Sequence, residues 1–330
     1  MMHLAVDLGT SFTKIYLAGS GIVLAEPSCL VLAAGTGRVL AVGSEAQSLL
    51  AGSRELLTVV RPVLEGEIAD EEAAAAMLSH FLRKVGIPPR RGHGMEALLS
   101  VHCGASDESL ARFRRVAEKS GIGIARFAEA PMLAAFGQGL EADDERPVFA
   151  AEIGGGSTNI AALSARGIRQ GVGLTLGSEN LDAGIIAAVS EKLGVRLRRQ
   201  EAARLKETVG SLYTGDNASL AVAGYAGERP CTVTVPAADI AAPVRLFADR
   251  LVQYIRLVLQ KLPQADVSFM LARGIRLSGG GARLTGLADY FSAALGTRAQ
   301  LSDRPQYAVI AGAGRAIENA DILRLVCLEE

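Results

Sequence analysis

Tryptophan is absent from this chain of 330 residues, and aromatic residues make up only 5% of it. Hydrophobic residues still make up 49%, which excludes a largely disordered chain and leaves Ala, Val, Ile and Leu to build the core. The formal net charge of −1 gives no general attraction to nucleic acid. No apolar run reaches the roughly 18 residues of a transmembrane helix. We therefore expect a globular protein of one large or two medium domains.

The residue types that build zinc sites are also scarce. The chain has four cysteines without a C-x-x-C pair and four histidines without H-x-x-x-H spacing. We expect no zinc site, and we expect the cysteines to serve as small apolar residues. The first residues enter a motif at once and predict no signal peptide, so a cytoplasmic protein is expected.

An internal echo is the most informative feature of the sequence. Residues 5–16 read A-V-D-L-G-T-S-F-T-K-I-Y, and residues 150–161 read A-A-E-I-G-G-G-S-T-N-I-A. Both units contain an apolar strand, an acidic residue, a glycine-rich turn and a second strand. Two such units half a chain apart predict a duplicated domain with two similar lobes; the alternative is a chance match of two glycine turns.

Hydrophobic patterns elsewhere alternate between strands and helices. They predict strands over 22–32, 39–42, 97–101 and 274–278, and helices over 71–85, 107–120 and 244–262. Asp70 is the expected N-cap of the first of these helices. The alternation favours the α/β class with at least one mixed sheet. The charged stretch at 141–146 is expected to be a solvated loop.

A glycine-rich turn after an acidic strand end has a physical use. Glycine lets backbone N–H groups approach phosphate oxygens closely, and neighbouring hydroxyl groups add donors. The carboxylates of Asp7 and Glu152 are suited to hold Mg²⁺ through water. Two such loops predict a clamp around one nucleotide, and a third glycine-rich loop at 279–281 offers a surface for the nucleoside.

These motifs resemble the actin, heat-shock chaperone and sugar kinase superfamily. D-L-G-T-S-F-T at 7–13 is similar to its first phosphate loop, E-I-G-G-G-S-T at 152–158 to its second, and L-S-G-G-G-A-R-L at 277–284 to its adenosine loop. The bacterial rod-shape-determining actin (MreB) family is the most similar branch, because V-R-P-V-L-E-G-E-I-A-D at 60–70 resembles its R-P-x-x-x-G-x-I-A-D. The resemblance covers nearly the whole chain.

The resemblance implies an actin-like, ribonuclease H-like fold: a duplicated two-lobed ATPase with a central nucleotide cleft. Lobe I would comprise 1–136 and 306–330, with a small subdomain near 32–61. Lobe II would comprise 137–305, with a small subdomain near 181–242.

The implied ligands are ATP or ADP and Mg²⁺, with Asp7 and Glu152 as the catalytic and metal-holding residues. The nucleotide-binding residues would be Gly9, Thr10, Ser11, Thr13, Gly154, Gly155, Gly156, Ser157, Thr158, Gly177, Lys206, Gly279, Gly280, Gly281 and Arg283. For Arg283, which resembles an arginine that stacks on adenine in the chaperone branch, an ordinary surface arginine is the alternative.

Departures from the family pattern bear on mechanism. In the family, a glutamate that orients the attacking water directly precedes Pro-Met, and Ala130 stands at that position. The glutamate that grips the ribose is replaced by Ala203. Losing a water-orienting group typically costs about a hundredfold or more in rate. We therefore expect ATP hydrolysis to be weak or lost, unless Glu129 or a water network substitutes for the missing group.

The resemblance implies a cytoskeletal nucleotide-binding protein that forms or regulates membrane-associated filaments guiding cell shape and cell-wall synthesis. Its partners would be further copies in a head-to-tail filament, the inner membrane surface and the cell-wall or elongation machinery. The candidate membrane contact is the loop 86–94, where Arg90 and Arg91 lie near Ile87; an ordinary exposed loop is the alternative.

Three other functions remain open. They are a catalytically silent pseudo-ATPase scaffold, a kinase or phosphatase of the sugar-kinase type, and a chaperone-like ATPase. The missing acids argue against an enzyme, and a chaperone would carry a substrate-binding domain that we do not expect here.

Overall fold

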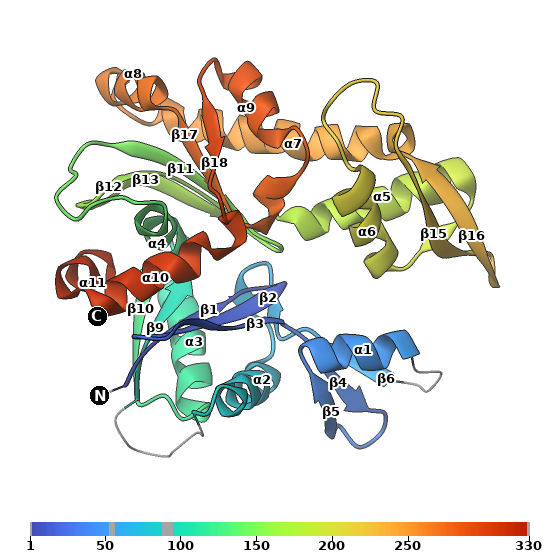
Figure 1. Ribbon diagram of the computed structural model, residues 1–330, viewed down its shortest axis with the longest axis horizontal. Coiled ribbons are helices and arrows are strands. Elements are labelled where there is room, and N and C mark those ends of the chain that lie inside the picture. The colour runs from blue at the N-terminus through green and yellow to red at the C-terminus, as the bar shows by residue number, and fades with distance from the viewer. Residues whose placement is uncertain (1, 53–56, 88–94, 329–330) are drawn as a thin grey trace.

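Two mixed β-sheets, each covered by helices, form the two halves of the protein. The computed structural model describes residues 2–52, 57–87 and 95–328. The sheets lie one above the other in Figure 1, and each carries a smaller three-stranded sheet toward the same end of the long axis. This arrangement confirms the α/β class and the two lobes predicted from the sequence.

The first sheet has the strand order β10-β9-β1-β2-β3, in which β1 pairs antiparallel with β2 and parallel with β9. Its strands are β1 Met2–Leu8, β2 Phe12–Leu17, β3 Gly21–Pro27, β9 Met95–Val101 and β10 Ile124–Glu129. Its core contacts include the buried faces of α2 Glu71–Lys84 and α3 Asp107–Lys119. Asp70 caps α2 as expected, since its carboxylate accepts from the Ala73 N–H at 2.9 Å.

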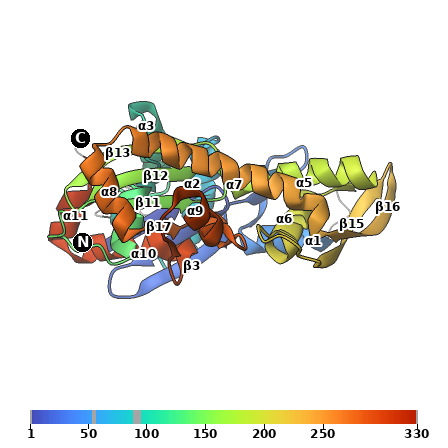
Figure 2. The same cartoon turned by 90° about the horizontal axis from the view of Figure 1, so that it is seen from above.

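The second sheet repeats this topology in the order β13-β12-β11-β17-β18, again with an antiparallel hairpin beside a parallel neighbour. Its strands are β11 Val148–Ile153, β12 Thr158–Ser164, β13 Gly167–Leu174, β17 Ile275–Ser278 and β18 Ala299–Leu301. Helices α7 Ala237–Gln260, α8 Gln264–Arg273 and α9 Leu287–Leu295 lie on its outer side (Figures 1 and 2). Because the two sheets match strand for strand, the duplication inferred from the echo is confirmed.

A small unit flanks each large sheet. The first is the sheet β5-β4-β6 with helix α1; its elements are β4 Leu30–Ala33, β5 Val39–Val42, α1 Ser44–Gly52 and β6 Leu57–Val60. The second is the sheet β14-β15-β16 with two helices; its elements are α5 Ser178–Leu193, β14 Arg196–Leu197, α6 Arg199–Val209, β15 Ser219–Ala226 and β16 Arg229–Pro236. The hairpin of β7 Val63–Leu64 and β8 Glu67–Ile68 follows the first unit. These units support the proposed subdomains near 32–61 and 181–242.

Two helices run between the large sheets: α4 Ala130–Gly137 and α10 Ala308–Glu318, the latter followed by α11 Ala320–Val326 (Figure 1). They cross at glycines. A Cβ at Gly312 would lie 1.8 Å from the Leu133 carbonyl oxygen, and one at Gly137 would lie 2.0 Å from that of Ala308. Backbones that approach this closely leave no room for any other residue. The packing of α10 on β1 and β2 supports our proposal that residues 306–330 belong to lobe I.

Two predicted elements were wrong in extent. The run 22–32 is not one strand, because the chain leaves the first large sheet after Pro27 and enters the small sheet at Leu30. The helix predicted at 244–262 begins at Ala237 and continues through Pro243. A proline inside a helix leaves one carbonyl without its usual donor. Here that carbonyl belongs to Asp239, and Lys192 donates to it at 2.9 Å.

The charged stretch at 141–146 is a loop with isolated turns, as expected. Among the residues that the structure describes, no helix has the length and apolar character needed to cross a membrane. Residues 88–94, which include most of the predicted membrane loop, lie outside the described part of the chain.

Candidate functional site

The two glycine-rich hairpin loops touch one another between the lobes. In the β1–β2 loop, the Gly9 N–H donates to the Phe12 carbonyl at 3.2 Å; in the β11–β12 loop, the Gly154 N–H donates to the Ser157 carbonyl at 2.8 Å. A Cβ at Gly155 would lie 1.9 Å from Ser11 Oγ. The echo in the sequence therefore corresponds to two equivalent turns that face each other at very close range.

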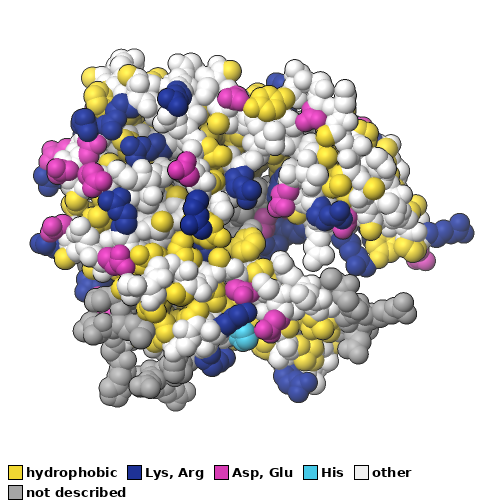
Figure 3. All heavy atoms as spheres, viewed as in Figure 1, with side chains coloured by type: hydrophobic (Ala, Val, Ile, Leu, Met, Phe, Trp, Pro, Cys, Tyr) yellow, Lys and Arg dark blue, Asp and Glu magenta, His cyan; other side chains and the backbone are white. Residues whose placement is uncertain are grey.

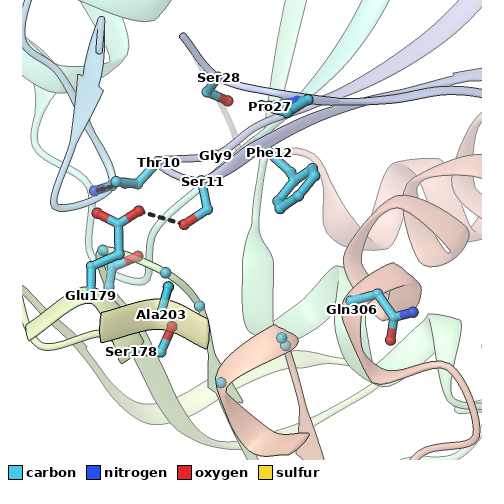
Figure 4. Close-up of a pocket in the computed structure, with 18 of the residues that line it drawn as sticks. Gly9, Thr10, Ser11, Phe12, Pro27, Ser28, Ser178, Glu179, Ala203 and Gln306 are labelled. Atoms are coloured by element: carbon cyan, nitrogen blue, oxygen red, sulfur yellow. Dashed lines mark hydrogen bonds between the residues drawn. The ribbon is translucent and has the colours of Figure 1, made fainter. Parts of the chain in front are cut away.

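A cleft of about 1140 Å³ opens where these loops meet, which is large enough for a nucleotide. Figure 3 shows the surface hollowed between the upper and lower halves of the molecule on the side of the small sheets. In Figure 4, Thr10 and Ser11 stand on one side of the cleft, Ser178, Glu179 and Ala203 stand on the other, and Gln306 lies across from them. Most predicted site residues line this cleft: Asp7, Gly9, Thr10, Ser11, Glu152, Gly154, Gly155, Gly156, Ser157, Lys206, Gly279, Gly280, Gly281 and Arg283.

Three predicted nucleotide contacts do not line the cleft. Thr13 is fully buried, and its hydroxyl shares a 2.9 Å hydrogen bond with that of Ser28. The Thr158 hydroxyl donates to the Leu176 carbonyl at 2.6 Å. Gly177 packs against the backbone of Gly155, where an added Cβ would lie 2.2 Å from a carbonyl oxygen. These residues support the loops from behind, because their polar groups or close contacts are used within the protein.

Asp7 and Glu152 each have a cross-strand partner seven residues later in the sequence. Asp7 faces Lys14, whose ammonium group lies 2.7 Å from Asp7 Oδ2, while Ser100 Oγ donates to Asp7 Oδ1 at 2.8 Å. Glu152 faces Asn159, whose amide nitrogen donates to Glu152 Oε2 at 2.8 Å. Both acids thus converge on the cleft floor with their hydrogen-bond partners already in place.

The Glu152 side chain is only 8% exposed, and this burial raises the pKa of its carboxyl to about 7. The nearby negative charge of Asp7 raises this pKa as well, while Asn159 and Lys14 oppose the shift. Burial disfavours the charged form of a carboxyl group because water no longer solvates it. At neutral pH, the Glu152 carboxyl group is therefore charged in part of the molecules and neutral in the rest.

This donor set does not fit a magnesium ion held by both acids. Mg²⁺ requires near-octahedral oxygen ligands, most of which are water or phosphate in nucleotide sites. Both oxygens of Asp7 already have partners within the protein, and one of these partners is the positively charged ammonium group of Lys14. Within residues 2–52, 57–87 and 95–328, no group of three or more His, Cys, Asp or Glu side chains is arranged to hold a metal. The sequence predicts Mg²⁺ held through water at Asp7 and Glu152, and the Lys14 ammonium group beside Asp7 disfavours a second cation there.

The third glycine-rich loop closes another side of the cleft. It follows β17, and Gly279 adopts a φ of +83°, a conformation that glycine adopts without strain. The Gly279 N–H donates to the Pro305 carbonyl at 2.8 Å, which joins the loop to the chain before α10. A Cβ at Gly280 would meet no atom within 4 Å, so this backbone faces open space. Such a loop suits a flat group that lies against the backbone.

Residues of helix α6 also line the cleft. Lys206 forms a 2.7 Å ion pair with Asp182 and donates to the Ser178 carbonyl at 3.0 Å. Ala203, one turn earlier on α6, presents only a methyl group to the cleft. The helix therefore contributes a fixed cation but no carboxylate at the position where a ribose-gripping acid was expected.

The two candidates for orienting a water molecule differ in their placement. Ala130, the first residue of α4, lines the cleft. The carboxylate of Glu129 accepts from the Gly104 N–H at 2.7 Å, and Glu129 is not among the residues that line the cleft. The carboxylate one position earlier thus does not reach the place that the missing glutamate would occupy.

A cluster of Ser11, Arg61, Glu179 and Arg199, called the ionic latch below, spans the cleft and was not predicted from the sequence. Glu179, near the start of α5, accepts from Ser11 Oγ at 2.6 Å and also pairs with Arg61 and Arg199. Ser11 and Arg61 belong to the first half of the chain, whereas Glu179 and Arg199 belong to the second. Lys14 was not predicted as a site residue either. The echo aligns Lys14 with Asn159, and each of these residues lies opposite the acid of its own hairpin.

Comparisons with known proteins agree over nearly the whole chain. The sequence model of the family described as "MreB/Mbl protein" matches residues 1–324. The cell shape-determining protein Mbl of Bacillus cereus is 30% identical over 325 residues, which cover 97% of each chain. The cell shape-determining protein MreB of Escherichia coli K12 is 30% identical over 326 residues, covering 97% of this chain and 94% of that protein.

Solved structures show the same fold. The crystal structure of MreB5 of Spiroplasma citri bound to ADP has a TM-score of 0.89 at 21% identity, covering 97% of both chains. The structure described as a MamK double helical filament has a TM-score of 0.80 at 22% identity, covering 96% of this chain and 99% of that one. The actin-like fold expected from the sequence is therefore confirmed.

Proposed function

The chain belongs to the MreB/Mbl family, and from that premise we propose that it is an actin-like cytoskeletal protein that binds an adenine nucleotide and assembles into filaments guiding cell shape. The single observation that carries the proposal is the meeting of the two glycine-rich hairpin loops on one cleft. Their backbone N–H groups and hydroxyls suit the oxygens of a polyphosphate. The third loop supplies the surface for the nucleoside.

The second part of the proposal is that hydrolysis of the bound nucleotide is weak or lost. It is supported by Ala130 at the cleft wall, by Ala203 on α6, and by the engagement of Glu129 with Gly104 outside the cleft. Phosphoryl transfer to water depends on a group that positions the water. With that group replaced by a methyl group, the cleft is suited to binding rather than to turnover.

Assembly and location are proposed from the relatives. The similar MamK structure is a filament, and the curated relatives are named for determining cell shape. We propose that this chain likewise forms filaments of its own copies at the inner face of the membrane, together with the cell-wall machinery. The test is sedimentation and light scattering of the purified chain with and without ATP, in buffer and on anionic vesicles. A chain that stays monomeric at every protein concentration would contradict the proposal.

Nucleotide binding is tested with a fluorescent ATP analogue and competition by unlabelled ATP and ADP. Gly280→Val is the informative variant, because a Cβ at Gly280 meets no atom within 4 Å and the residue lines the cleft. We expect it to weaken binding at least about tenfold without loss of folding. The control is Ala238→Val on the exposed start of α7, outside the cleft. Equal affinity of Gly280→Val and the wild type would refute the placement of the nucleotide.

Catalytic silence is tested in the same samples by following phosphate release. We expect saturated binding with almost no phosphate from the wild type. Ala130→Glu returns a carboxylate to the cleft wall and should raise release by about a hundredfold. Rapid release by the wild type would show that another group orients the water.

A further inference from the structure

The two glycine-rich hairpins differ in charge at one pair of equivalent positions. Antiparallel register places Lys14 opposite Asp7 in the first hairpin and Asn159 opposite Glu152 in the second. Asn159 shows that a neutral amide serves the fold at this position, because it bonds to the acid across the strand pair just as Lys14 does. The hairpin geometry therefore does not require a cation at Lys14.

Lys14 lies in the cleft, where its positive charge can act on a bound ligand. Its side chain is 14% exposed, that of its partner Asp7 is 15% exposed, and both residues line the cleft. The ammonium group thus lies beside the two glycine-rich loops, where the phosphate charge would be bound. A nucleotide triphosphate brings several negative charges to a place that already contains two acids, and an uncompensated set of this kind is strongly unfavourable.

We propose that Lys14 is a built-in counter-cation, so that this chain binds its nucleotide without depending on a divalent metal ion. The Lys14 ammonium group lies 2.7 Å from Asp7 Oδ2 and so neutralises that acid. An ammonium group is a compact point charge with three donors, so it can hold Asp7 and still donate to a phosphate oxygen. The inference rests on the proposed nucleotide binding and adds the metal dependence of that binding.

The experiment measures the affinity of the full chain for the fluorescent ATP analogue in magnesium and in EDTA. For the wild type, we expect the two dissociation constants to agree within about threefold. Lys14→Asn copies the residue of the second lobe, and it should weaken binding about tenfold or more in EDTA, with a smaller loss in magnesium. Lys14→Arg keeps the charge and should remain insensitive to EDTA.

Two further measurements separate this role from a structural one. Lys84→Asn removes an ion-paired lysine outside the cleft and should leave the response to EDTA unchanged. Circular dichroism shows whether Lys14→Asn is folded, and Lys14→Met, which keeps the apolar stem, replaces it if it is not. A wild type that loses tenfold or more in EDTA, or a Lys14→Asn variant as insensitive as the wild type, would overturn the inference while nucleotide binding stands. Absence of binding in both conditions would overturn the proposed function and this inference together.

Discussion

Replacing Glu152 by Gln should stabilise the protein at neutral and alkaline pH but not in acid. Glu152 is 8% exposed and accepts from Asn159, and burial raises the pKa of its carboxyl to about 7. In the unfolded chain, the pKa of the same group lies near the ordinary glutamate value of 4.5. The folded state therefore holds a proton more tightly than the unfolded state between these two pH values.

The sign of the effect follows from proton linkage. The contribution of Glu152 to stability is fully present below about pH 4.5, falls as the pH rises toward 7, and stays at its lowest level above that. One pKa unit corresponds to roughly 1.4 kcal/mol, so the rise of the pKa from 4.5 to about 7 lowers the free energy of unfolding at high pH by on the order of 3 kcal/mol. Gln resembles the neutral carboxyl group and can still accept from Asn159 through its carbonyl oxygen. It therefore avoids the loss that the wild type shows on ionisation.

The assay is urea unfolding of the wild type and Glu152→Gln at pH 4 and pH 8, without nucleotide and in EDTA. We expect nearly equal free energies of unfolding at the acidic pH and a variant about 3 kcal/mol more stable at the alkaline pH. The control is Glu72→Gln. Glu72 forms an exposed ion pair with Lys119, and this variant should show no such dependence on pH. A difference between wild type and Glu152→Gln that is the same at both pH values would refute the assignment of a raised pKa to Glu152.

Two further predictions concern contacts between the halves of the molecule. Glu179→Gln removes the negative charge of the ionic latch and leaves an oxygen that accepts from Ser11. It should speed release of the fluorescent nucleotide about tenfold in stopped-flow experiments, because the two arginines lose their ionic partner. An unchanged release rate would show that the latch does not hold the cleft closed. Gly312→Ala places a Cβ 1.8 Å from the Leu133 carbonyl, so it should lower the free energy of unfolding by about 3 kcal/mol even though alanine is the better helix former. Gly280→Ala, which meets nothing, is the control, and thermal melts of equal midpoint for both variants would disprove the close crossing of α4 and α10.

Local patterns in the sequence predicted the parts of the fold that depend on near neighbours. The helix spacing and cap at Asp70 predicted α2 to within one residue at its end. The echo predicted both hairpins, since strand, acid and glycine turn recur in the same order. The long helix α7 was predicted to begin at 244, whereas it begins at Ala237 and contains Pro243. Lys192, from another helix, supplies the donor that this proline removes, and no local pattern shows that contact.

In the candidate site, too, local features were predictable from the sequence and distant contacts were not. The sequence by itself determined which residues form the three glycine-rich loops and which two acids end their strands, because both depend on residue type and on spacing within a few positions. Only the tertiary structure decided that Thr13, Thr158 and Gly177 lie behind the loops. It also decided that Glu179 reaches Ser11 across 168 positions of sequence. The first three residues are held by neighbouring strands and loops of their own lobe, and the contact between Glu179 and Ser11 is set by how the two lobes pack together. No local period or turn signal carries that information.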